Sequence, residues 1–120
     1  MPVVKSRVQL VMRYHEIRVS KKYGRGVYAI DDIKAGTTVL KNRMIIEKDG
    51  GPLCERFAFY VDRKHSGIAL GDVSLLNHSE NENAEWDICK KRQVIIVKTT
   101  KDIKAGEQIF INYGYDPTEN

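Results

Sequence analysis

The pair Asn77-His78 follows two leucines, so strongly polar side chains stand where an apolar run reaches the edge of the core. Buried polar groups need hydrogen-bond partners, which either a bound polar ligand or a backbone turn can supply. Residues 77 to 79 also match the N-x-S sequon for glycosylation, but the first residues of the chain lack the apolar segment of a signal peptide. The sequence therefore leaves a ligand site and a structural turn as the two interpretations of Asn77-His78.

Two glycines, Gly24 and Gly26, precede the strand-like run Val27–Ile30. Residues 24 to 29 formally match the dinucleotide fingerprint G-x-G-x-x-A, which requires a helix directly after the glycines. The residues after Gly26 favour a strand, and Gly36 follows too soon for a useful helix, so the fingerprint does not apply. Glycines that begin a strand can instead let a ligand lie against the backbone, and a plain hairpin turn is the structural alternative.

The segment from Gly106 to Asp116 is an alternating strand that runs into Tyr113-Gly114-Tyr115. Two phenol groups therefore lie close together near the end of this strand. By itself this pattern favours packing residues with a solvated hydroxyl, because tyrosine combines an apolar ring with a polar end. A catalytic role for Tyr113 needs the support of the other two segments.

Composition excludes several other classes of site. Cys54 and Cys89 form no C-x-x-C unit, and with three scattered histidines they fall short of a zinc site, so we predict no metal. We expect both cysteines to be reduced and to lie in or near the core. The net charge of +4 permits attraction to nucleic acid without indicating it. Lys90-Lys91-Arg92 has no interleaved aromatic residue and is typical of a turn, so nucleic acid is not predicted as a direct ligand.

The elements that must position these segments are those of one small, mostly β domain with little helix, because 120 residues suffice for one domain. Gly50-Gly51-Pro52 predicts a turn, and Leu53–Val61, with apolar residues at helical spacing, is the best candidate for a helix. No apolar run approaches the roughly 20 residues that cross a bilayer, so we expect a soluble intracellular protein of nucleus or cytoplasm. The short β-branched runs predicted as strands are Val8–Met12, Val27–Ile30, Val39–Leu40, Met44–Ile46 and Val94–Val97.

The pentapeptide Asp32-Ile33-Lys34-Ala35-Gly36 recurs letter for letter as residues 102 to 106, and each copy stands between two strand-like runs. Its glycine suits a left-handed position that closes one helical turn, and its isoleucine can anchor that turn to the core. Two copies this far apart are too few for a solenoid. We predict one strand-turn-strand device used twice in a compact fold, with a chance repeat as the alternative.

Together and in this order, the three segments resemble the SET-domain protein lysine methyltransferases. The matching pieces are Gly24–Tyr28, Ala69–Ser79, and Gly106–Gln108 leading to Tyr113, and the two pentapeptides fall where the family places its I-x-x-G turns. The resemblance covers residues 15 to 116 of the single domain 1–120, after an extension of residues 1–14, and is strongest to minimal single-domain members from viruses and bacteria. It implies a β-clip of small sheets in which the Asn-His segment and the C-terminal strand cross as a pseudoknot.

The resemblance also implies an activity, namely methyl transfer from S-adenosylmethionine to the side-chain amine of a lysine in a protein, such as a histone tail. Such a displacement by a neutral amine depends mainly on positioning, and an apolar channel lowers the pKa of the lysine. Tyr113 matches the catalytic tyrosine of the family. By the same match the cofactor-binding residues are Lys22, Gly24, Arg25, Gly26, Asn77, His78 and Tyr113. The candidate walls of the lysine channel, with ordinary core packing as the alternative, are Phe59, Tyr60, Ile111 and Tyr115.

The chain departs from the family pattern at three points. Glu82-Asn83 replaces the Pro-Asn that often follows N-H-S, and Ile111 stands where many members have an aromatic residue that restricts the number of methyl groups added. Many relatives also continue after the position of Tyr115 with a segment that closes the lysine channel. We therefore expect the partner subunit of a homodimer, or residues 1–14, to close it. A catalytically silent SET-like binding module is the alternative function.

Overall fold

The computed structural model of the protein describes residues 14–48 and 58–114. Within these ranges the chain forms strands and one short 3-10 helix, with no α-helix, so the predicted mostly β class is confirmed. None of its described helices is long and apolar enough to span a membrane. The elements are β1 (His15–Ser20), β2 (Gly24–Ala29), β3 (Thr38–Lys48), β4 (Ala58–Asp62), β5 (His65–Ala69), η1 (Asp72–Leu75), β6 (Asn77–His78), β7 (Ala84–Cys89), β8 (Val94–Thr99) and β9 (Gln108–Ile111).

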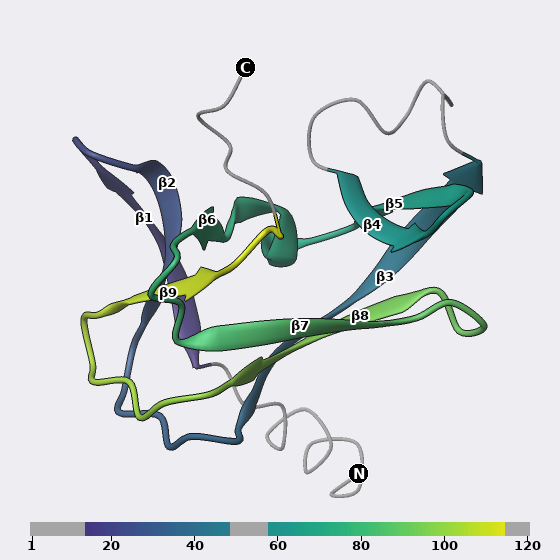
Figure 1. The fold of residues 1–120 in the computed structure, drawn as a ribbon. Coiled ribbons are helices and arrows are strands. Elements are labelled where there is room, and N and C mark those ends of the chain that lie inside the picture. The colour runs from purple at the N-terminus through teal and green to yellow at the C-terminus, as the bar shows by residue number, and fades with distance from the viewer. Residues whose placement is uncertain (1–13, 49–57, 115–120) are drawn as a thin grey trace, which may run out of the picture.

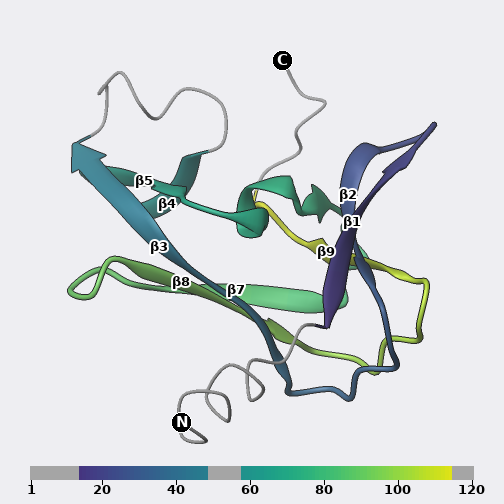
Figure 2. The same cartoon turned by 180° about the vertical axis from the view of Figure 1, so that it is seen from behind.

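The long strand β3 organises a five-stranded sheet of order β4-β5-β3-β8-β7 (Figures 1 and 2). Its first half pairs with β8, as in Lys41 opposite Ile96, and its second half pairs with β5, as in Ile45 opposite Ile68. The runs Val39–Leu40 and Met44–Ile46, predicted as separate strands, therefore belong to one strand. The polar residues between them do not break it, because they pair with the start of β8.

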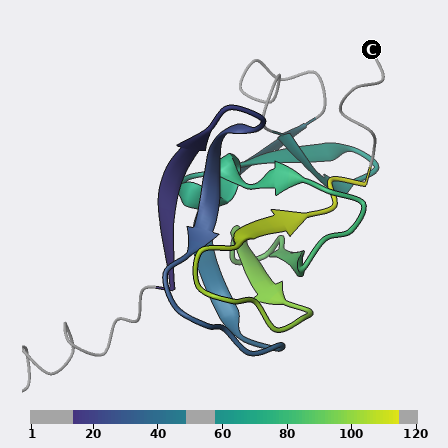
Figure 3. The ribbon, with the colours of Figure 1, turned by 90° about the vertical axis from the view of Figure 1, so that its left-hand side faces the viewer.

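The second sheet has the order β1-β2-β9-β6, and Figure 3 shows β9 lying between β2 and β6. β9 is antiparallel to β2 and parallel to β6, where Asn77 stands opposite Phe110 and His78 opposite Ile111. The backbone of Ser79 extends the pairing by donating to the carbonyl of Ile111. The Asn-His segment and the C-terminal strand, which the family resemblance predicts to cross, are thus direct neighbours.

The predicted helix Leu53–Val61 is wrong over the part that the structure describes. Ala58–Asp62 is strand β4, which pairs with β5, so that Phe59 stands opposite Gly67. Phe59 is buried and Tyr60 is exposed, an alternation with the period of a strand. Pairing with β5 therefore overrides the helical spacing. Residues 49–57, which include the turn at Gly50-Gly51-Pro52, lie outside the described residues, as does the predicted strand Val8–Met12.

The repeated pentapeptide forms the same turn twice, and the two turns pair with each other. Ile33 and Ile103 are both buried and form an antiparallel bridge, each donating its N–H to the other's carbonyl at 2.7 and 2.8 Å. Gly36 and Gly106 have φ values of +85° and +88°, in the left-handed region that favours glycine. The predicted anchoring by isoleucine and the predicted glycine conformation are therefore both confirmed.

The aspartate of each pentapeptide accepts a hydrogen bond from the backbone of the other pentapeptide. The side chain of Asp102 accepts the N–H of Ala35, and the side chain of Asp32 accepts the N–H of Ala105, both at 2.9 Å. Each turn thus satisfies a backbone donor of the other, in a locally two-fold arrangement. This arrangement ties the β2–β3 connection to the β8–β9 connection and fixes where β9 begins.

The core is one cluster to which both sheets contribute. Val27 and Ile109 come from the four-stranded sheet, and Ile95 and Val97 come from the five-stranded sheet. The expectation that both cysteines lie in or near the core is wrong for Cys89, which lies exposed with a free thiol on the solvent side of the alternating strand β7. Cys54 lies outside the described residues.

Candidate functional site

Tyr113 is held from two sides by the segment that contains the Asn-His pair. Its backbone N–H donates to Nδ1 of His78 at 2.9 Å, and the two rings lie 5.0 Å apart between centroids. Its hydroxyl donates to the carbonyl of Leu76 at 2.6 Å. Because Nδ1 of His78 acts as an acceptor, the neutral ring carries its proton on Nε2. β6 and β9 therefore fix both the ring and the hydroxyl of Tyr113.

Asn77 connects this segment to the glycine turn. Its side-chain amide donates to the carbonyl of Arg25 at 2.9 Å and to the side-chain carbonyl of Gln108 at 2.7 Å. The amide of Gln108 in turn donates to the hydroxyl of Tyr28 at 3.1 Å. This network joins β2, β6 and β9 through side chains that a polar ligand could share.

Gly26 is the position where this network requires the absence of a side chain. A Cβ atom at Gly26 would collide with Oε1 of Gln108 and lie 2.9 Å from Nδ2 of Asn77. Gly24 differs, because its φ of +68° favours glycine while nothing lies within 4 Å of the position of a Cβ. Gly26 therefore allows Gln108 and Asn77 to pack closely against the turn, whereas the space beside Gly24 is open.

The backbone of the glycine turn has one edge that is not paired with a strand. β2 pairs with β1 along Gly24–Ala29, but its pairing with β9 begins only at Val27. On that second side, the side chain of Asn77 reaches the carbonyl of Arg25. Lys22 and Arg25 are exposed beside this edge, and the Lys22 ammonium lies 5.2 Å from the centroid of the Tyr23 ring. A backbone edge that no strand covers, with two exposed cations in the same turn, suits a polar ligand that carries a carboxylate.

Phe59, a candidate channel residue, lies in the core and not on the surface. Its ring packs edge-to-face on Trp86 with centroids 5.2 Å apart. The indole N–H of Trp86 donates to the carbonyl of Asn112 at 2.9 Å. Phe59 is thus connected through Trp86 to the backbone directly before Tyr113.

The other candidate channel residues differ in their exposure to solvent. Tyr60 is 65% exposed on β4, and Ile111 is fully buried in β9. Tyr115 lies outside the described residues. A channel lining that includes these residues remains a prediction.

Gln108 and Trp86 are the functional candidates that sequence reasoning misses. Gln108 is only 9% exposed, one of two buried polar residues in the described part of the chain. A glutamine beside the apolar run Ile109–Ile111 was the available signal, because a buried amide must find partners. Nothing local to Trp86 indicates that its indole bonds to Asn112, 26 residues further along the chain.

Replacing Gln108→Ala is expected to lower the free energy of unfolding by about 1 kcal/mol, the usual net value of such hydrogen bonds. The change leaves one amide proton of Asn77 without its acceptor and removes the donor to Tyr28. Urea denaturation followed by circular dichroism measures the effect. Tyr28→Phe, which removes one end of the network, should cost less than Gln108→Ala. Equal stability of Gln108→Ala and the parent protein would contradict a stabilising role.

No group of three or more His, Cys, Asp or Glu side chains in residues 14–48 and 58–114 is placed to hold a metal ion. The polar groups around Asn77 and Tyr113 are amides, a phenol, an imidazole and backbone carbonyls. This set is suited to binding and orienting organic groups by hydrogen bonds.

Comparison with known proteins identifies the family. The sequence pattern described as "SET domain" matches residues 24–114, which extend from the glycine turn to the residue after Tyr113. The chain is also 27% identical over 115 residues to a histone-lysine N-methyltransferase of Schizosaccharomyces pombe, described as specific for lysine 37 of histone H3. The matched region covers 90% of this chain and 78% of that relative.

Solved structures show the same fold at lower sequence identity. A proposed histone methyltransferase of Plasmodium falciparum superposes with a TM-score of 0.75 at 23% identity, over 89% of this chain and 98% of the other. A humanized mutant of Polycomb Repressive Complex 2 of Chaetomium thermophilum gives a TM-score of 0.71 at 24% identity, over 87% of this chain and 15% of the other. The sequence match and the shared fold together show that this chain belongs to the SET-domain family.

Proposed function

We propose that the chain is a protein-lysine methyltransferase that transfers a methyl group from S-adenosylmethionine to the side-chain amine of a lysine in another protein. The observation that carries this proposal is the bond from Asn77 to the carbonyl of Arg25. It joins the Asn-His segment to the glycine turn, while the bond from Tyr113 to His78 adds the third matched segment. All three pieces on which the family resemblance rests therefore meet at one place.

S-adenosylmethionine supplies an electrophilic methyl group on a sulfonium when it is bound. We assign its binding to Lys22, Gly24, Arg25, Gly26, Asn77 and His78. Lys22 and Arg25 suit its carboxylate, because both cations are exposed beside the unpaired edge of β2. Both amide protons of Asn77 are engaged within the protein, and no other described residue donates to its Oδ1. That oxygen is suited to accept a hydrogen bond from the ammonium group of the cofactor.

Tyr113 is assigned the catalytic position. Because its hydroxyl donates to the carbonyl of Leu76, the phenol oxygen retains lone pairs directed away from that carbonyl. These lone pairs can orient a lysine amine without accepting its proton. Orientation of this kind contributes to rate mainly through positioning, which in favourable cases lowers a barrier by roughly 7 to 11 kcal/mol.

Transfer of a radiolabelled methyl group from S-adenosylmethionine to core histones and to a cell lysate tests the proposal. Labelling of a protein band, lost in the Tyr113→Phe variant, would support a lysine methyltransferase. Binding of S-adenosylhomocysteine without transfer to any protein would select the silent binding module instead. Absence of both binding and transfer by a folded protein would contradict the assigned cofactor site.

Methylation of a lysine-rich tail peptide is expected to fall steeply as salt is added. The acidic segment of residues 79–87 contains Glu80, Glu82, Glu85 and Asp87 and no basic residue. It adjoins the site, because Ser79 donates to Ile111 and Asn83 bonds to both Gln108 and Phe110. Attraction between this segment and a basic peptide acts mainly on encounter and is screened by salt.

Changing both Glu80→Gln and Glu82→Gln should lower the peptide's kcat/KM and flatten its salt dependence. Asp31→Asn removes one exposed charge outside the segment and serves as the control. Activity that does not depend on salt would contradict electrostatic recruitment. A homodimer remains a separate prediction, which a sedimenting mass of about twice that of the monomer would support.

A further inference from the structure

Two hairpin turns that are distant in sequence meet at one end of the five-stranded sheet (Figure 1). The β4–β5 turn carries Arg63 and Lys64, and the β7–β8 turn carries Lys90, Lys91 and Arg92. All five side chains are exposed. We refer to these five residues as the basic tip.

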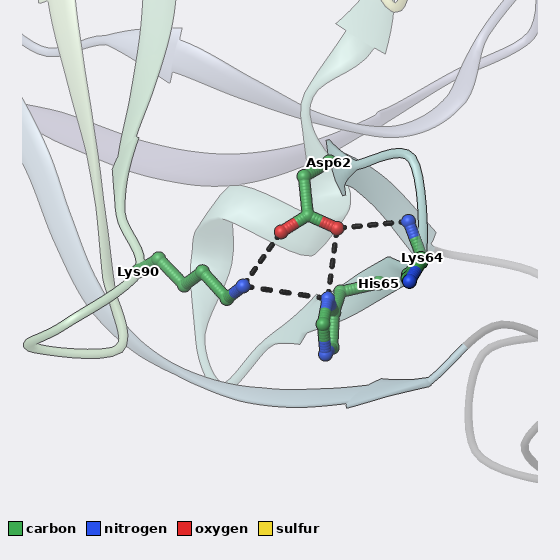
Figure 4. A network of polar contacts seen from close by, with 4 residues as sticks. All are labelled: Asp62, Lys64, His65 and Lys90. Carbon is green, nitrogen blue, oxygen red and sulfur yellow. Dashed lines mark hydrogen bonds and ion pairs between the residues drawn. The ribbon is translucent and has the colours of Figure 1, made fainter.

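The two turns are fixed to each other by Asp62, as Figure 4 shows. One carboxylate oxygen of Asp62 lies 2.6 Å from the Lys90 ammonium. The other accepts the backbone N–H of Lys64 at 2.9 Å and lies 2.8 Å from Nδ1 of His65. The Lys90 ammonium and these hydrogen bonds hold the pKa of Asp62 well below its usual range. The tip is therefore an assembled surface in which one carboxylate offsets only one of five cations.

The composition of the two turns limits the kind of partner. Residues 62–65 and 90–93 contain no apolar residue, no Phe, Tyr or Trp, and no acid besides Asp62. The centre of a protein interface is usually apolar or aromatic, so the tip does not suit a folded acidic protein. Single-stranded nucleic acid is usually bound by stacking of bases on several aromatic side chains. The two turns offer only the imidazole of His65, which is already bonded to Asp62.

A nucleic-acid duplex has the charge density that such a surface needs. Its backbone carries one negative charge per roughly 1.7 Å of helix axis, and binding by Lys and Arg releases condensed counterions. Arg63 and Arg92, one on each turn, can also form paired hydrogen bonds with phosphate oxygens. Both counterion release and hydrogen bonding to phosphate oxygens are independent of the base sequence.

Lys90-Lys91-Arg92 alone gave no reason to expect nucleic acid as a ligand, but the structure adds Arg63 and Lys64 beside them. We propose that the basic tip binds the phosphate backbone of a nucleic-acid duplex without sequence specificity. This binding uses none of the residues assigned to cofactor or catalysis and does not depend on methyl transfer. Glu80 and Glu82 of the acidic segment precede β7, and the Lys90–Arg92 part of the basic tip follows it. If the proposed function also holds, a substrate that combines a basic tail with bound duplex would contact both the acidic segment and the basic tip.

Fluorescence anisotropy with a labelled duplex of about 20 base pairs tests the proposal directly. We expect a dissociation constant between about 10⁻⁴ and 10⁻⁶ M near physiological salt, and a slope of log K against log salt of about −4. The triple variant Arg63→Gln, Lys91→Gln, Arg92→Gln should bind more weakly, with a slope flatter by about 3. None of these three side chains makes a hydrogen bond or ion pair with another described residue, so folding should be retained.

The matched control is the triple variant Lys34→Gln, Lys101→Gln, Lys104→Gln. It removes the same charge from exposed positions in and beside the two repeated pentapeptides, outside the basic tip. This control should retain most of the parent protein's affinity for the duplex and a similar slope of log K against log salt. Equal losses in both variants would overturn the proposal, because attraction would then follow net charge alone. Tighter binding of a single strand of equal length, or equally strong binding of polyglutamate, would also overturn it.

Discussion

Replacing Asn77→Ala is expected to weaken the binding of S-adenosylhomocysteine by about 1 to 3 kcal/mol, a factor of roughly 5 to 150. The side-chain amide of Asn77 is the direct connection between the carbonyl of Arg25 and the side chain of Gln108. Its loss leaves both acceptors without this donor and removes the oxygen assigned to the cofactor. The effect should therefore combine a lost ligand contact with a loosened glycine turn.

Isothermal titration calorimetry with S-adenosylhomocysteine measures this loss independently of turnover. Asn81→Ala is the matched control, because Asn81 is an exposed asparagine four residues further along the chain and its side chain makes no hydrogen bond with another described residue. The control should bind like the parent protein. An unchanged affinity in a folded Asn77→Ala protein would remove Asn77 from the cofactor site.

Replacing Tyr113→Phe is expected to cut turnover tenfold or more, a rise in the barrier of at least about 1.4 kcal/mol, with little change in fold or cofactor affinity. The ring contact with His78 and the bond from the backbone N–H to Nδ1 of His78 both survive the change. What disappears is the hydroxyl whose position the carbonyl of Leu76 fixes. The loss should therefore appear in kcat more than in binding.

Steady-state kinetics and calorimetric titration of the same variant separate these two effects. Tyr14→Phe, a change in a half-buried tyrosine that packs against the core, controls for the general loss of a phenol. It should leave kcat near the parental value. Methylation by Tyr113→Phe at the parental rate would show that Tyr113 is a wall of the site and not a catalytic residue.

The sequence predicted those features that depend on local backbone preference. The left-handed glycines of the repeated pentapeptide and the turn at Lys90–Arg92 follow from residue type, and both occur as expected. The helix predicted over Leu53–Val61 was wrong where it can be examined. Over so short a run its apolar spacing is compatible with both the helical and the strand period. Pairing of β4 with β5 decided in favour of the strand.

The sequence predicted which segments form the candidate site but not the hydrogen bonds that connect them. Residue types and their order along the chain indicated Gly24, Gly26, Asn77, His78 and Tyr113, because the three segments resemble family motifs, and the family match spans all of them. The bonds that connect them depend on the parallel pairing of β6 with β9, between residues more than 30 positions apart in the chain. No local preference specifies such a pairing.

By itself, the sequence determined the mostly β class, the two turns of the repeated pentapeptide and the family to which the chain belongs. Only the tertiary structure decided that Gln108 would satisfy Asn77 and that the two turns would exchange their aspartate bonds. It likewise turned Lys90–Arg92, an ordinary turn in the sequence, into half of a basic surface pinned by Asp62 across 28 residues. The physical reason is common to all three. Side-chain hydrogen bonds and ion pairs act over a few ångströms, so they depend on which distant strands are neighbours, and cross-strand packing of the whole domain decides that.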